Sequence, residues 1–323
     1  MFNTEFNIIL KYFNHQKNTN NVHVGIGDDA ALVSVPKDYQ LAITTDTMVS
    51  NVHFFPNISP KNLAYKLIVI SFSDIAAMGA QPIWLSLALT IPNINHNWLK
   101  KFSISLFQQL NFYKVQLIGG DITRGPLSIT TTTHGLVPKE RYITRFGISD
   151  GDLIYVLGTL GDSAAGLAIL QSKLYINNIK DRNWLINAHL RPKIWISQGI
   201  ELRNIASSMI DISDGLISAM ENILKINNCG AKIKLNHLPI SKVLQNQCSK
   251  EQALAFALSG GEEYSLCFTV PKKKYYLLKE NFLKKNKKYC FCIGNINTNK
   301  RGIKYIDKNK EISLSYTGFE HFV

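Results

Sequence analysis

The chain has 323 residues, of which 46% are apolar and 18% are charged, and its formal net charge is +13. This is the composition of a globular protein long enough for two domains, and it excludes a disordered chain. No apolar run reaches the roughly 18 residues that a membrane-spanning helix needs, and the first segment carries Glu5 and lacks the basic region of an export signal. We therefore expect a soluble, cytoplasmic protein.

The predicted elements of the first part of the chain alternate between helix and strand. The segment up to about Gln16 is predicted as an amphipathic helix whose apolar residues form one buried stripe: Phe2, Phe6, Ile9, Leu10 and Phe13. A strand at 41–45 should deliver Asp46 at its end. A helix at 59–80 should begin at Ser59 before Pro60, and it places Asp74 near its last turns, where a carboxylate among apolar residues is costly unless something binds it.

Further elements follow the same alternation. We predict a strand at 83–91, a helix at about 95–112, a strand at 115–120 that ends at the Gly119-Gly120 pair, and a strand at 128–137. A second domain should begin near residue 148 with a strand at 151–159, followed by a helix at 162–170, a strand at 207–213 and a helix at 214–226 that Asp214 caps. The pattern predicts an α/β fold with domains at 1–147 and 148–323.

The cysteines and lysines support no special site of their own. The cysteines are Cys229, Cys248, Cys267, Cys290 and Cys292, an odd number without a CxxC pair, so we predict reduced, buried thiols. Strand alternation should turn Cys290 and Cys292 to one face, where packing is the expected role. Much of the positive charge lies at Lys272–Lys274 and at 284–288, without a nucleic-acid-binding motif, so we favour a solvated helix face.

Six short acidic motifs, each beside glycine or a small residue, are spread over most of the chain. They are GIGDDAA at 25–31, TTDTM at 44–48, SDIAAMG at 73–79, GGDITRG at 119–125, DISDGL at 211–216 and SGGEEY at 259–264. Two carboxylates about 4 Å apart repel by roughly 4 kcal/mol at an effective dielectric of 20, so a cluster of them needs protons or cations. Mg²⁺ prefers such hard oxygen ligands, together with waters and substrate phosphates. Any one motif alone could simply mark a turn, but the six together predict a metal–phosphate site.

Other nucleotide-binding and catalytic motifs are absent from the sequence. GIGDDAA has the spacing of a dinucleotide fingerprint, but Asp28 and Asp29 stand where a pyrophosphate needs donors. The chain has no P-loop, no HRD or DFG kinase signature and no G-x-S-x-G elbow. A nucleotide should therefore be held through metal ions.

The six motifs, together with His53-Phe54 and GFEHF at 318–322, resemble in the same order the thiamine-monophosphate kinase family, over essentially the whole chain. That family belongs to the aminoimidazole ribonucleotide synthetase-like ATP-binding superfamily. The resemblance implies a two-domain α/β (α+β) fold, with a mixed N-terminal sheet that joins a dimer barrel and an α/β C-terminal domain. Sister enzymes that need a Cys near the N-terminus or at the C-terminal end do not fit, because no Cys precedes Cys229 and the chain ends in Val323.

The implied activity is the ATP-dependent phosphorylation of thiamine monophosphate to thiamine diphosphate, in thiamine diphosphate biosynthesis. We expect direct in-line transfer on several Asp-bound Mg²⁺ ions, ATP as co-substrate, a homodimer, and no nucleic-acid or membrane partner. Residues 1–147 would bind ATP and Mg²⁺ and form the dimer, and residues 148–323 would complete the nucleotide and substrate site.

The resemblance also implies roles for individual residues. The Mg²⁺ ligands would be Asp29, Thr44, Thr45, Asp46, Asp74, Asp121, Asp211 and Asp214. ATP would contact Gly120, Asp121, Arg145 and Ser213, and the catalytic carboxylates would be Asp46, Asp121 and Asp211. The substrate would contact His53, Glu262 and Phe319, whose ring offers a face to the cationic thiazolium.

Two departures and two alternatives accompany this interpretation. Glu263 stands where the family commonly has Asp, and Phe319 where Trp or Tyr is frequent. One alternative is another ATP-dependent phosphotransferase of the superfamily, acting on a different phosphorylated or carboxylated acceptor. The other is a basic nucleic-acid-binding protein that uses its lysines.

Overall fold

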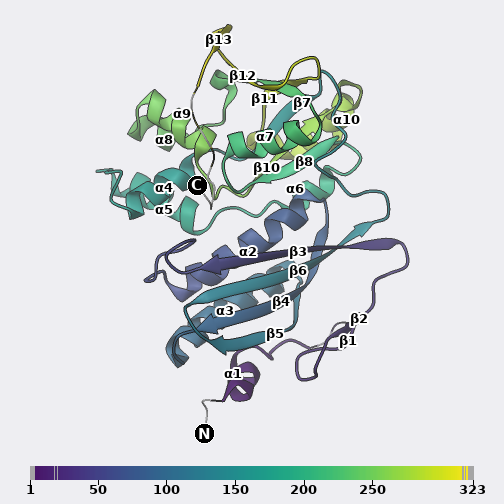
Figure 1. Cartoon of the computed structure of the whole chain (residues 1–323), viewed down its shortest axis with the longest axis vertical. Coiled ribbons are helices and arrows are strands. Elements are labelled where there is room, and N and C mark those ends of the chain that lie inside the picture. Colours follow the sequence, from purple (N-terminus) through teal and green to yellow (C-terminus); the bar gives the residue numbers. More distant parts are fainter. Residues whose placement is uncertain (1–3, 18, 20, 315, 317, 319–323) are drawn as a thin grey trace. The chain divides into compact units, whose positions relative to one another are not determined.

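The computed structural model describes residues 4–17, 19, 21–314, 316 and 318. The chain divides into two compact units (Figure 1). The N-terminal unit consists of Met1–Ile75 and Ala80–Glu140, and the C-terminal unit of Ala76–Gly79 and Arg141–Val323. Each unit contains a mixed sheet with helices, which confirms the predicted α/β fold class.

The main sheet of the first half has the strand order β3-β6-β4-β5, in which β4 and β5 are parallel and the other neighbours antiparallel. A separate antiparallel ladder joins β1 to β2. The elements are α1 (Glu5–Tyr12), β1 (Val22–Val24), β2 (Leu32–Val33), β3 (Tyr39–Val49), α2 (Pro60–Ala77), β4 (Gln81–Ile91), α3 (His96–Tyr113), β5 (Gln116–Arg124) and β6 (Ser128–Pro138).

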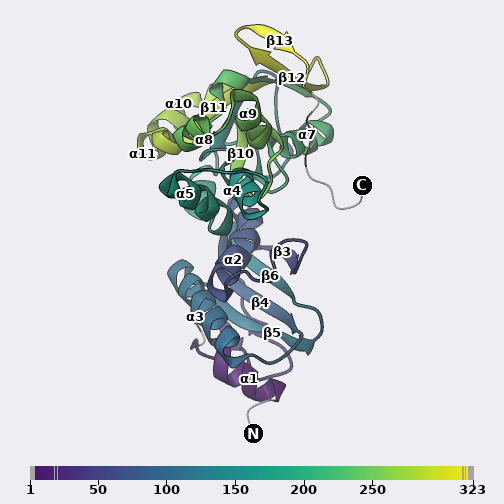
Figure 2. The same ribbon diagram turned by 90° about the vertical axis from the view of Figure 1, so that its left-hand side faces the viewer.

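Local sequence explains where the two long helices begin. Ser59 Oγ accepts a hydrogen bond of 3.2 Å from Asn62 N ahead of α2, and Pro60 occupies the first helical position, as predicted. Asn95 caps α3 in the same way, because its side chain accepts from Trp98 N at 3.0 Å. Both helices lie on one side of the sheet (Figure 2), and α3 buries a row of apolar side chains spaced three and four apart: Leu99, Phe102, Leu106 and Leu110.

Three predictions about this half are wrong. Helix α1 buries Ile8 and Tyr12, whereas Phe6 and Leu10 of the predicted stripe are 63% and 42% exposed. Phe13 of that stripe is buried, and Phe2 lies outside the described residues. Strand β3 runs on to Val49, so Asp46 lies within the strand and not at its end. Strand β5 continues through the Gly119-Gly120 pair to Arg124, with a register shift against β4 between Leu117 and Gly119, because glycine can adopt the unusual backbone that continued pairing requires.

The C-terminal unit has the strand order β13-β12-β9-β11-β7-β10-β8, in which β12 and β9 are parallel and the other neighbours antiparallel. Its strands are β7 (Leu153–Leu157), β8 (Ser208–Ile212), β9 (Gly230–Lys234), β10 (Ser265–Val270), β11 (Cys290–Asn297), β12 (Gly302–Asp307) and β13 (Lys310–Ile312). Its helices are α4 (Asp162–Leu170), α5 (Ile179–Leu190), α6 (Ile196–Glu201), α7 (Leu216–Ile226), α8 (Lys242–Gln247), α9 (Lys250–Ser259), α10 (Tyr275–Leu277) and α11 (Lys284–Asn286), with short 3-10 or π turns η1 (Leu235–His237), η2 (Lys272–Lys274), η3 (Leu278–Leu283) and η4 (Lys287–Tyr289).

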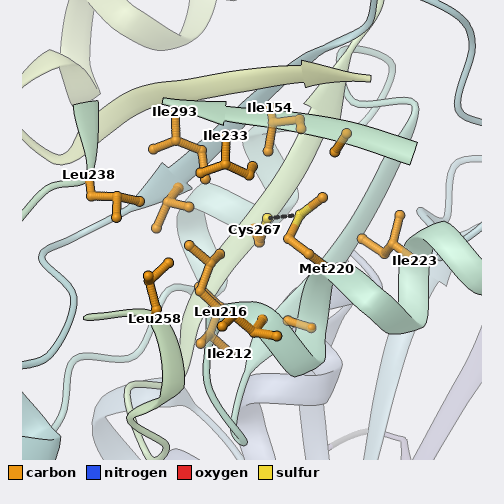
Figure 3. Close-up of a cluster of buried hydrophobic side chains, with 14 of the residues drawn as sticks. Ile154, Ile212, Leu216, Met220, Ile223, Ile233, Leu238, Leu258, Cys267 and Ile293 are labelled. Carbon is orange, nitrogen blue, oxygen red and sulfur yellow. Dashed lines mark hydrogen bonds between the residues drawn. The ribbon is translucent and has the colours of Figure 1, made fainter. Parts of the chain in front are cut away.

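Helix α7 packs its apolar face on the central strands of this sheet (Figure 3). Leu216, Met220 and Ile223 recur at helical spacing and meet Ile212 and Cys267. Cys267 Sγ lies 3.6 Å from Met220 Sδ. The cysteines of the described residues are free thiols, as predicted, but the predicted burial is confirmed only for Cys229, Cys267 and Cys290, because Cys248 and Cys292 are partly exposed. Burial raises the pKa of Cys267 to about 12, which is typical of an inert packing cysteine.

Candidate functional site

Strand β3 places two predicted metal ligands on one face of the N-terminal sheet. Because side chains alternate along a strand, Thr44 and Asp46 point the same way as the buried Met48. Thr44 Oγ1 donates a hydrogen bond of 2.6 Å to Asp74 Oδ2, which joins two motifs that are 30 residues apart. This hydroxyl satisfies part of the hydrogen-bonding need of a half-buried carboxylate in the last turn of α2.

The neighbouring strand extends this polar environment. Thr131 and Thr133 of β6 are fully buried and pair in register with Asp46 and Thr44. The Ser71 and Thr131 hydroxyls hydrogen-bond between α2 and β6. We call the set Thr44, Asp46, Ser71, Asp74, Thr131 and Thr133 the β3–α2 polar layer. A line of hydroxyls and carboxylates in place of apolar packing marks this face of the sheet as more than a structural core.

Thr45 lies on the opposite face of β3 from Thr44 and Asp46. Its hydroxyl is exposed and hydrogen-bonds Thr132 Oγ1 at 2.9 Å. The strand therefore brings Thr44 and Asp46 together but turns the Thr45 side chain away. Thr45 can therefore act as a metal ligand together with Thr44 and Asp46 only through its main-chain carbonyl oxygen.

Asp29 and Asp121 line one pocket of about 660 Å³ in the N-terminal unit. Asp29 belongs to the GIGDD loop, where its N–H donates to Asp28 Oδ1 at 2.8 Å, and Asp121 is an exposed residue of β5. Side chains from α1 and its C-terminal end also line the pocket: Glu5, Phe6, Ile9, Leu10 and Phe13. Phe6 and Leu10, which are the exposed members of the predicted stripe, therefore face this pocket. The pocket combines carboxylates with an apolar wall, as ligand sites do.

Gly120 is required immediately before Asp121. Its φ is +150°, and a Cβ there would lie 1.8 Å from the Leu87 carbonyl oxygen on β4. Only a residue without a side chain allows β5 to approach β4 this closely. Gly120 therefore controls where the Asp121 carboxylate stands.

His53 follows β3 in a tight turn. The ring Nδ1 of His53 accepts a hydrogen bond of 3.0 Å from Val49 N, and the main-chain N–H of His53 donates to Val49 O at 2.9 Å. An accepting Nδ1 requires the ring proton on Nε2, so the ring presents an N–H donor on its other side. A fixed donor of this kind suits an anionic group such as a phosphate.

The DISDGL motif forms the end of β8 and the start of α7. Asp211 is 5% exposed on β8, the edge strand of the sheet, whereas Asp214 is exposed in the following loop, where Ser213 Oγ donates to its Oδ2 at 3.3 Å. The prediction that Asp214 caps the helix is wrong: the cap residue is Gly215, at φ +100°, without a side-chain hydrogen bond. Asp214 thus keeps its carboxylate available in the loop.

The DISDGL and SGGEEY loops lie side by side. Glu262 N donates to Ser213 O at 2.5 Å, and Tyr264 N donates to Ile212 O at 2.8 Å. Gly318 of the C-terminal motif packs on the same loop, since a Cβ there would lie 2.9 Å from the Asp214 carbonyl oxygen. The predicted substrate residue Phe319 comes next and lies outside the described residues.

Arg145 belongs to a segment that is anchored through its main chain. The carbonyl oxygen of Arg145 accepts hydrogen bonds from Asn227 Nδ2 at 2.7 Å and Ser208 Oγ at 3.2 Å. The side chain is exposed. A fixed backbone with an exposed guanidinium is suited to contact with an anionic ligand.

A second acidic cluster lies beside the SGGEEY loop, and its member Asp162 was not among the residues predicted from the motifs. Glu263 Oε1 accepts hydrogen bonds from Gly161 N at 2.8 Å and Ser163 N at 3.1 Å, so its carboxylate caps the start of α4. Burial, reinforced by the Asp162 carboxylate, raises the pKa of Glu263 well above its usual range. Burial also raises the pKa of Asp162, and this effect outweighs the lowering by a hydrogen bond of 2.6 Å from Ser241 Oγ. The GDS sequence at 161–163, a glycine beside an acid at a strand-to-helix junction, was the available signal.

We predict that Glu263→Gln weakens the pH dependence of folding. Because the folded pKa is raised, the native protein keeps this proton at pH values where the unfolded chain, with an ordinary pKa of about 4.3, has lost it. The free energy of unfolding therefore falls as the pH rises above that value, and the variant should lose part of this slope. Urea unfolding between pH 4.5 and 8 measures it, with the exposed Glu221→Gln as control. An unchanged slope in Glu263→Gln would contradict the prediction.

The other glutamate of the pair, Glu262, turns to α5. Its Oε2 lies 3.3 Å from Nδ1 of His189, which is 2% exposed. Glu262 has a left-handed backbone with φ +62°, and its side chain is 22% exposed. The two adjacent glutamates thus have different environments: Glu263 is buried at a helix terminus, and Glu262 is reachable from solvent.

The chemistry of the predicted ligands fits Mg²⁺. They offer carboxylate and hydroxyl oxygens, which are hard donors, and the Thr44–Asp74 hydrogen bond shows two of them already in contact. Within the described residues, no three His, Cys, Asp or Glu side chains converge as a ready-made metal cage.

Two domain models match the chain. AIR synthase related protein, N-terminal domain, matches residues 27–137, and AIR synthase related protein, C-terminal domain, matches residues 149–305. In the described part of the chain, no helix is long and apolar enough to cross a membrane.

Relatives with assigned names match over almost the full length. The thiamine-monophosphate kinase of Buchnera aphidicola subsp. Schizaphis graminum is 50% identical over 320 residues, which cover 99% of each chain. The crystal structure of thiamine-monophosphate kinase from Stenotrophomonas maltophilia K279a is 34% identical, with a TM-score of 0.82 over 88% of this chain and 91% of that one. AaThiL complexed with AMPPCP and TMP is 30% identical, with a TM-score of 0.77 over 92% of each chain. The chain is a kinase that belongs to the thiamine-monophosphate kinase family of the AIR synthase-like superfamily.

Proposed function

We propose that this chain transfers the γ-phosphoryl group of ATP to thiamine monophosphate, giving thiamine diphosphate and ADP. The observation that carries the proposal is the 50% identity to a thiamine-monophosphate kinase over 99% of both chains. The complex of a 30% identical relative with AMPPCP and TMP supports the same pair of ligands, because AMPPCP is an ATP analogue.

The proposed step is a direct in-line transfer. A phosphate oxygen of thiamine monophosphate forms a bond to the γ-phosphorus, and the bond from that phosphorus to the β–γ bridging oxygen breaks, so that ADP leaves with the electron pair. The attacking oxygen is already anionic near neutral pH, and no strong general base is required. The protein must position the two phosphates and neutralise their charge.

Residues of the N-terminal unit are suited to the phosphate end of the reaction. We infer that Asp46 and Asp74 of the β3–α2 polar layer, with Thr44, and Asp29 and Asp121 of the pocket hold Mg²⁺. In the C-terminal unit, Asp211 and Asp214 are the corresponding candidates. Bound Mg²⁺ supplies positive charge at the phosphate oxygens. Gly120 sets the position of Asp121, and Arg145 and Ser213 are the proposed ATP contacts.

Three residues are assigned to the substrate by the same proposal. His53 offers its Nε2–H to the substrate phosphate, and the partly exposed Glu262 offers a carboxylate to the cationic part of thiamine. Phe319 is proposed as the aromatic face. We propose residues 1–147 as the ATP- and Mg²⁺-binding and dimerisation domain, and 148–323 as the domain that completes the nucleotide and substrate site.

The test is an ADP-release assay on the purified chain with ATP, Mg²⁺ and thiamine monophosphate. Turnover should depend on the acceptor, stop with EDTA and return when excess Mg²⁺ is added. Turnover with a different phosphorylated or carboxylated acceptor only would support another phosphotransferase of the superfamily. Chirally labelled γ-phosphate tests the in-line step, since inversion at phosphorus is expected and retention would indicate a covalent phosphoenzyme.

We propose further that the chain is a homodimer joined through the N-terminal sheet. One face of that sheet carries α2 and α3, and among the described residues of this unit no helix covers the other face (Figure 2). The uncovered face holds small and hydroxyl side chains, with Thr47 bonded to Thr130 at 2.8 Å, and Ile43 on it is 59% exposed. An exposed isoleucine on an otherwise regular sheet face is suited to an interface with a second copy.

Ile43→Glu is therefore expected to convert the protein from dimer to monomer. A buried, unpaired carboxylate at an interface costs several kcal/mol, enough to shift association by orders of magnitude. Sedimentation equilibrium measures the mass against that of the wild type. Ile104→Glu on α3, which replaces another exposed isoleucine, is the control and should leave the mass unchanged. A wild-type protein that is monomeric at micromolar concentration would rule out the dimer.

A further inference from the structure

We propose that His189 is a positioning residue, which holds the Glu262 carboxylate in the orientation that binds substrate. The inference rests on the proposed function, because that function assigns Glu262 to thiamine monophosphate. His189 is not one of the residues for which the motifs predict a role. It enters through its contact with Glu262, at 3.3 Å between Nδ1 and Oε2.

The contact fixes the protonation of the ring. A carboxylate oxygen only accepts hydrogen bonds, so Nδ1 of His189 must carry a proton to interact favourably with Glu262. The ring is 2% exposed, whereas the Glu262 side chain is 22% exposed. One end of this carboxylate is thus held from inside the protein, while part of the side chain reaches solvent and a ligand.

His189 does not form a nucleophilic triad with the adjacent serine. Ser163 Oγ lies 3.3 Å from the same Nδ1 that faces Glu262, whereas a proton relay uses the two opposite ring nitrogens. Ser163 is also fully buried, so no substrate atom can reach its hydroxyl. The cluster is built to hold a carboxylate in place.

The backbone around His189 and Glu262 is closely packed, so the contact between them can set the position of the Glu262 carboxylate. Helices α4 and α5 approach so closely at Gly166 that a Cβ there would lie 2.1 Å from the Leu185 carbonyl oxygen and 2.9 Å from His189 Cβ. Glu262 is held at φ +62° by its N–H bond to Ser213 O. The Glu262 side chain has several rotatable bonds, and the His189 contact limits their freedom.

Two substitutions separate positioning from packing. The amide nitrogen of asparagine occupies the place of histidine Nδ1, and that of glutamine the place of Nε2, so His189→Asn keeps the donor to Glu262 and His189→Gln does not. We expect His189→Gln to raise the KM for thiamine monophosphate about tenfold, the order of effect of losing one close polar contact to a charged group, with little change in the KM for ATP. His189→Asn should stay within about threefold of the wild type.

Thermal unfolding gives the readout for packing. Asparagine fills less of the cavity than glutamine, so His189→Asn should be the less stable variant although it is the better enzyme. Leu185→Ala, which opens a cavity in the same helix, should lower the unfolding midpoint and leave the KM for thiamine monophosphate unchanged. If KM follows stability across these variants, the positioning role is overturned.

The Glu262→Gln variant shows whether the effect passes through Glu262. It should raise the KM for thiamine monophosphate, and adding His189→Gln to it should cause no further loss, because the carboxylate that His189 positions is no longer present. Additive losses overturn the inference. A wild type without thiamine monophosphate turnover instead overturns the proposed function, and an unchanged KM in Glu262→Gln overturns the assignment of Glu262. Both of these outcomes differ from a third one, in which His189→Asn and His189→Gln have the same KM for thiamine monophosphate. That third outcome refutes only the role of His189.

Discussion

An Asp46→Asn protein is expected to lose thiamine monophosphate turnover by a factor of about 10³, the order of effect seen when a group that stabilises transition-state charge is removed. Asparagine has the same shape as aspartate but no charge, so it should bind Mg²⁺ poorly at this position. Asp46 lies on the same face of β3 as Thr44, whose hydroxyl is bonded to Asp74. The loss should appear in kcat with saturating Mg²⁺, measured as ADP release.

The fold of this variant should be intact. Asp46 shares the β3–α2 polar layer with Asp74, and removing one of two like charges in the metal-free protein relieves repulsion. The unfolding midpoint is therefore expected to stay the same or rise. Asp38→Asn, at an exposed position just before β3, is the matched control and should retain wild-type activity. An active Asp46→Asn enzyme would remove Asp46 from the proposed catalytic set.

Gly120→Ala is expected to destabilise the N-terminal unit by more than about 3 kcal/mol, which is at the severe end of single substitutions. The new Cβ would lie 1.8 Å from the Leu87 carbonyl oxygen, so main chain must move against main chain, and φ +150° is unfavourable for alanine in any case. Chemical denaturation, followed by fluorescence and circular dichroism, measures the loss.

The preceding glycine provides the control for this prediction. A Cβ at Gly119 would meet nothing within 4 Å, so Gly119→Ala should change the free energy of unfolding by less than about 1 kcal/mol. Both variants replace one glycine of β5 with alanine, so they have the same composition and differ only in the position of the change. Equal stability of Gly119→Ala and Gly120→Ala would show that β5 does not pack on β4 in the way described.

Several elements of the fold could be predicted because their signals are local. Ser59 and Pro60 begin α2, and Asn95 begins α3, since caps and first-turn residues act within four positions of one another. The exposure of Phe6 and Leu10 on α1 could not be predicted in this way. Periodicity identifies the apolar side of a helix but not what covers it, and in this case part of that side lines the Asp29–Asp121 pocket.

The site shows the same division. The family resemblance placed Thr44, Asp46 and Asp74 among the same proposed ligands, and in the structure the Thr44 hydroxyl donates a hydrogen bond to Asp74. Thr45 was grouped with them by sequence, but strand alternation turns its side chain to the other face. The adjacent Glu262 and Glu263 are also separated by the fold, because Glu262 faces His189 whereas Glu263 caps α4.

The sequence by itself determined the family, the alternation of helices and strands, and the types of side chain that carry the chemistry, because order and spacing of short motifs are properties of the chain. Only the tertiary structure decided which of those side chains meet. The bond from Thr44 to Asp74 and the contact from His189 to Glu262 join residues 30 and 73 positions apart, and no local rule specifies such pairs. Strand register and the close packing of helices at glycine set them, and both depend on the whole fold.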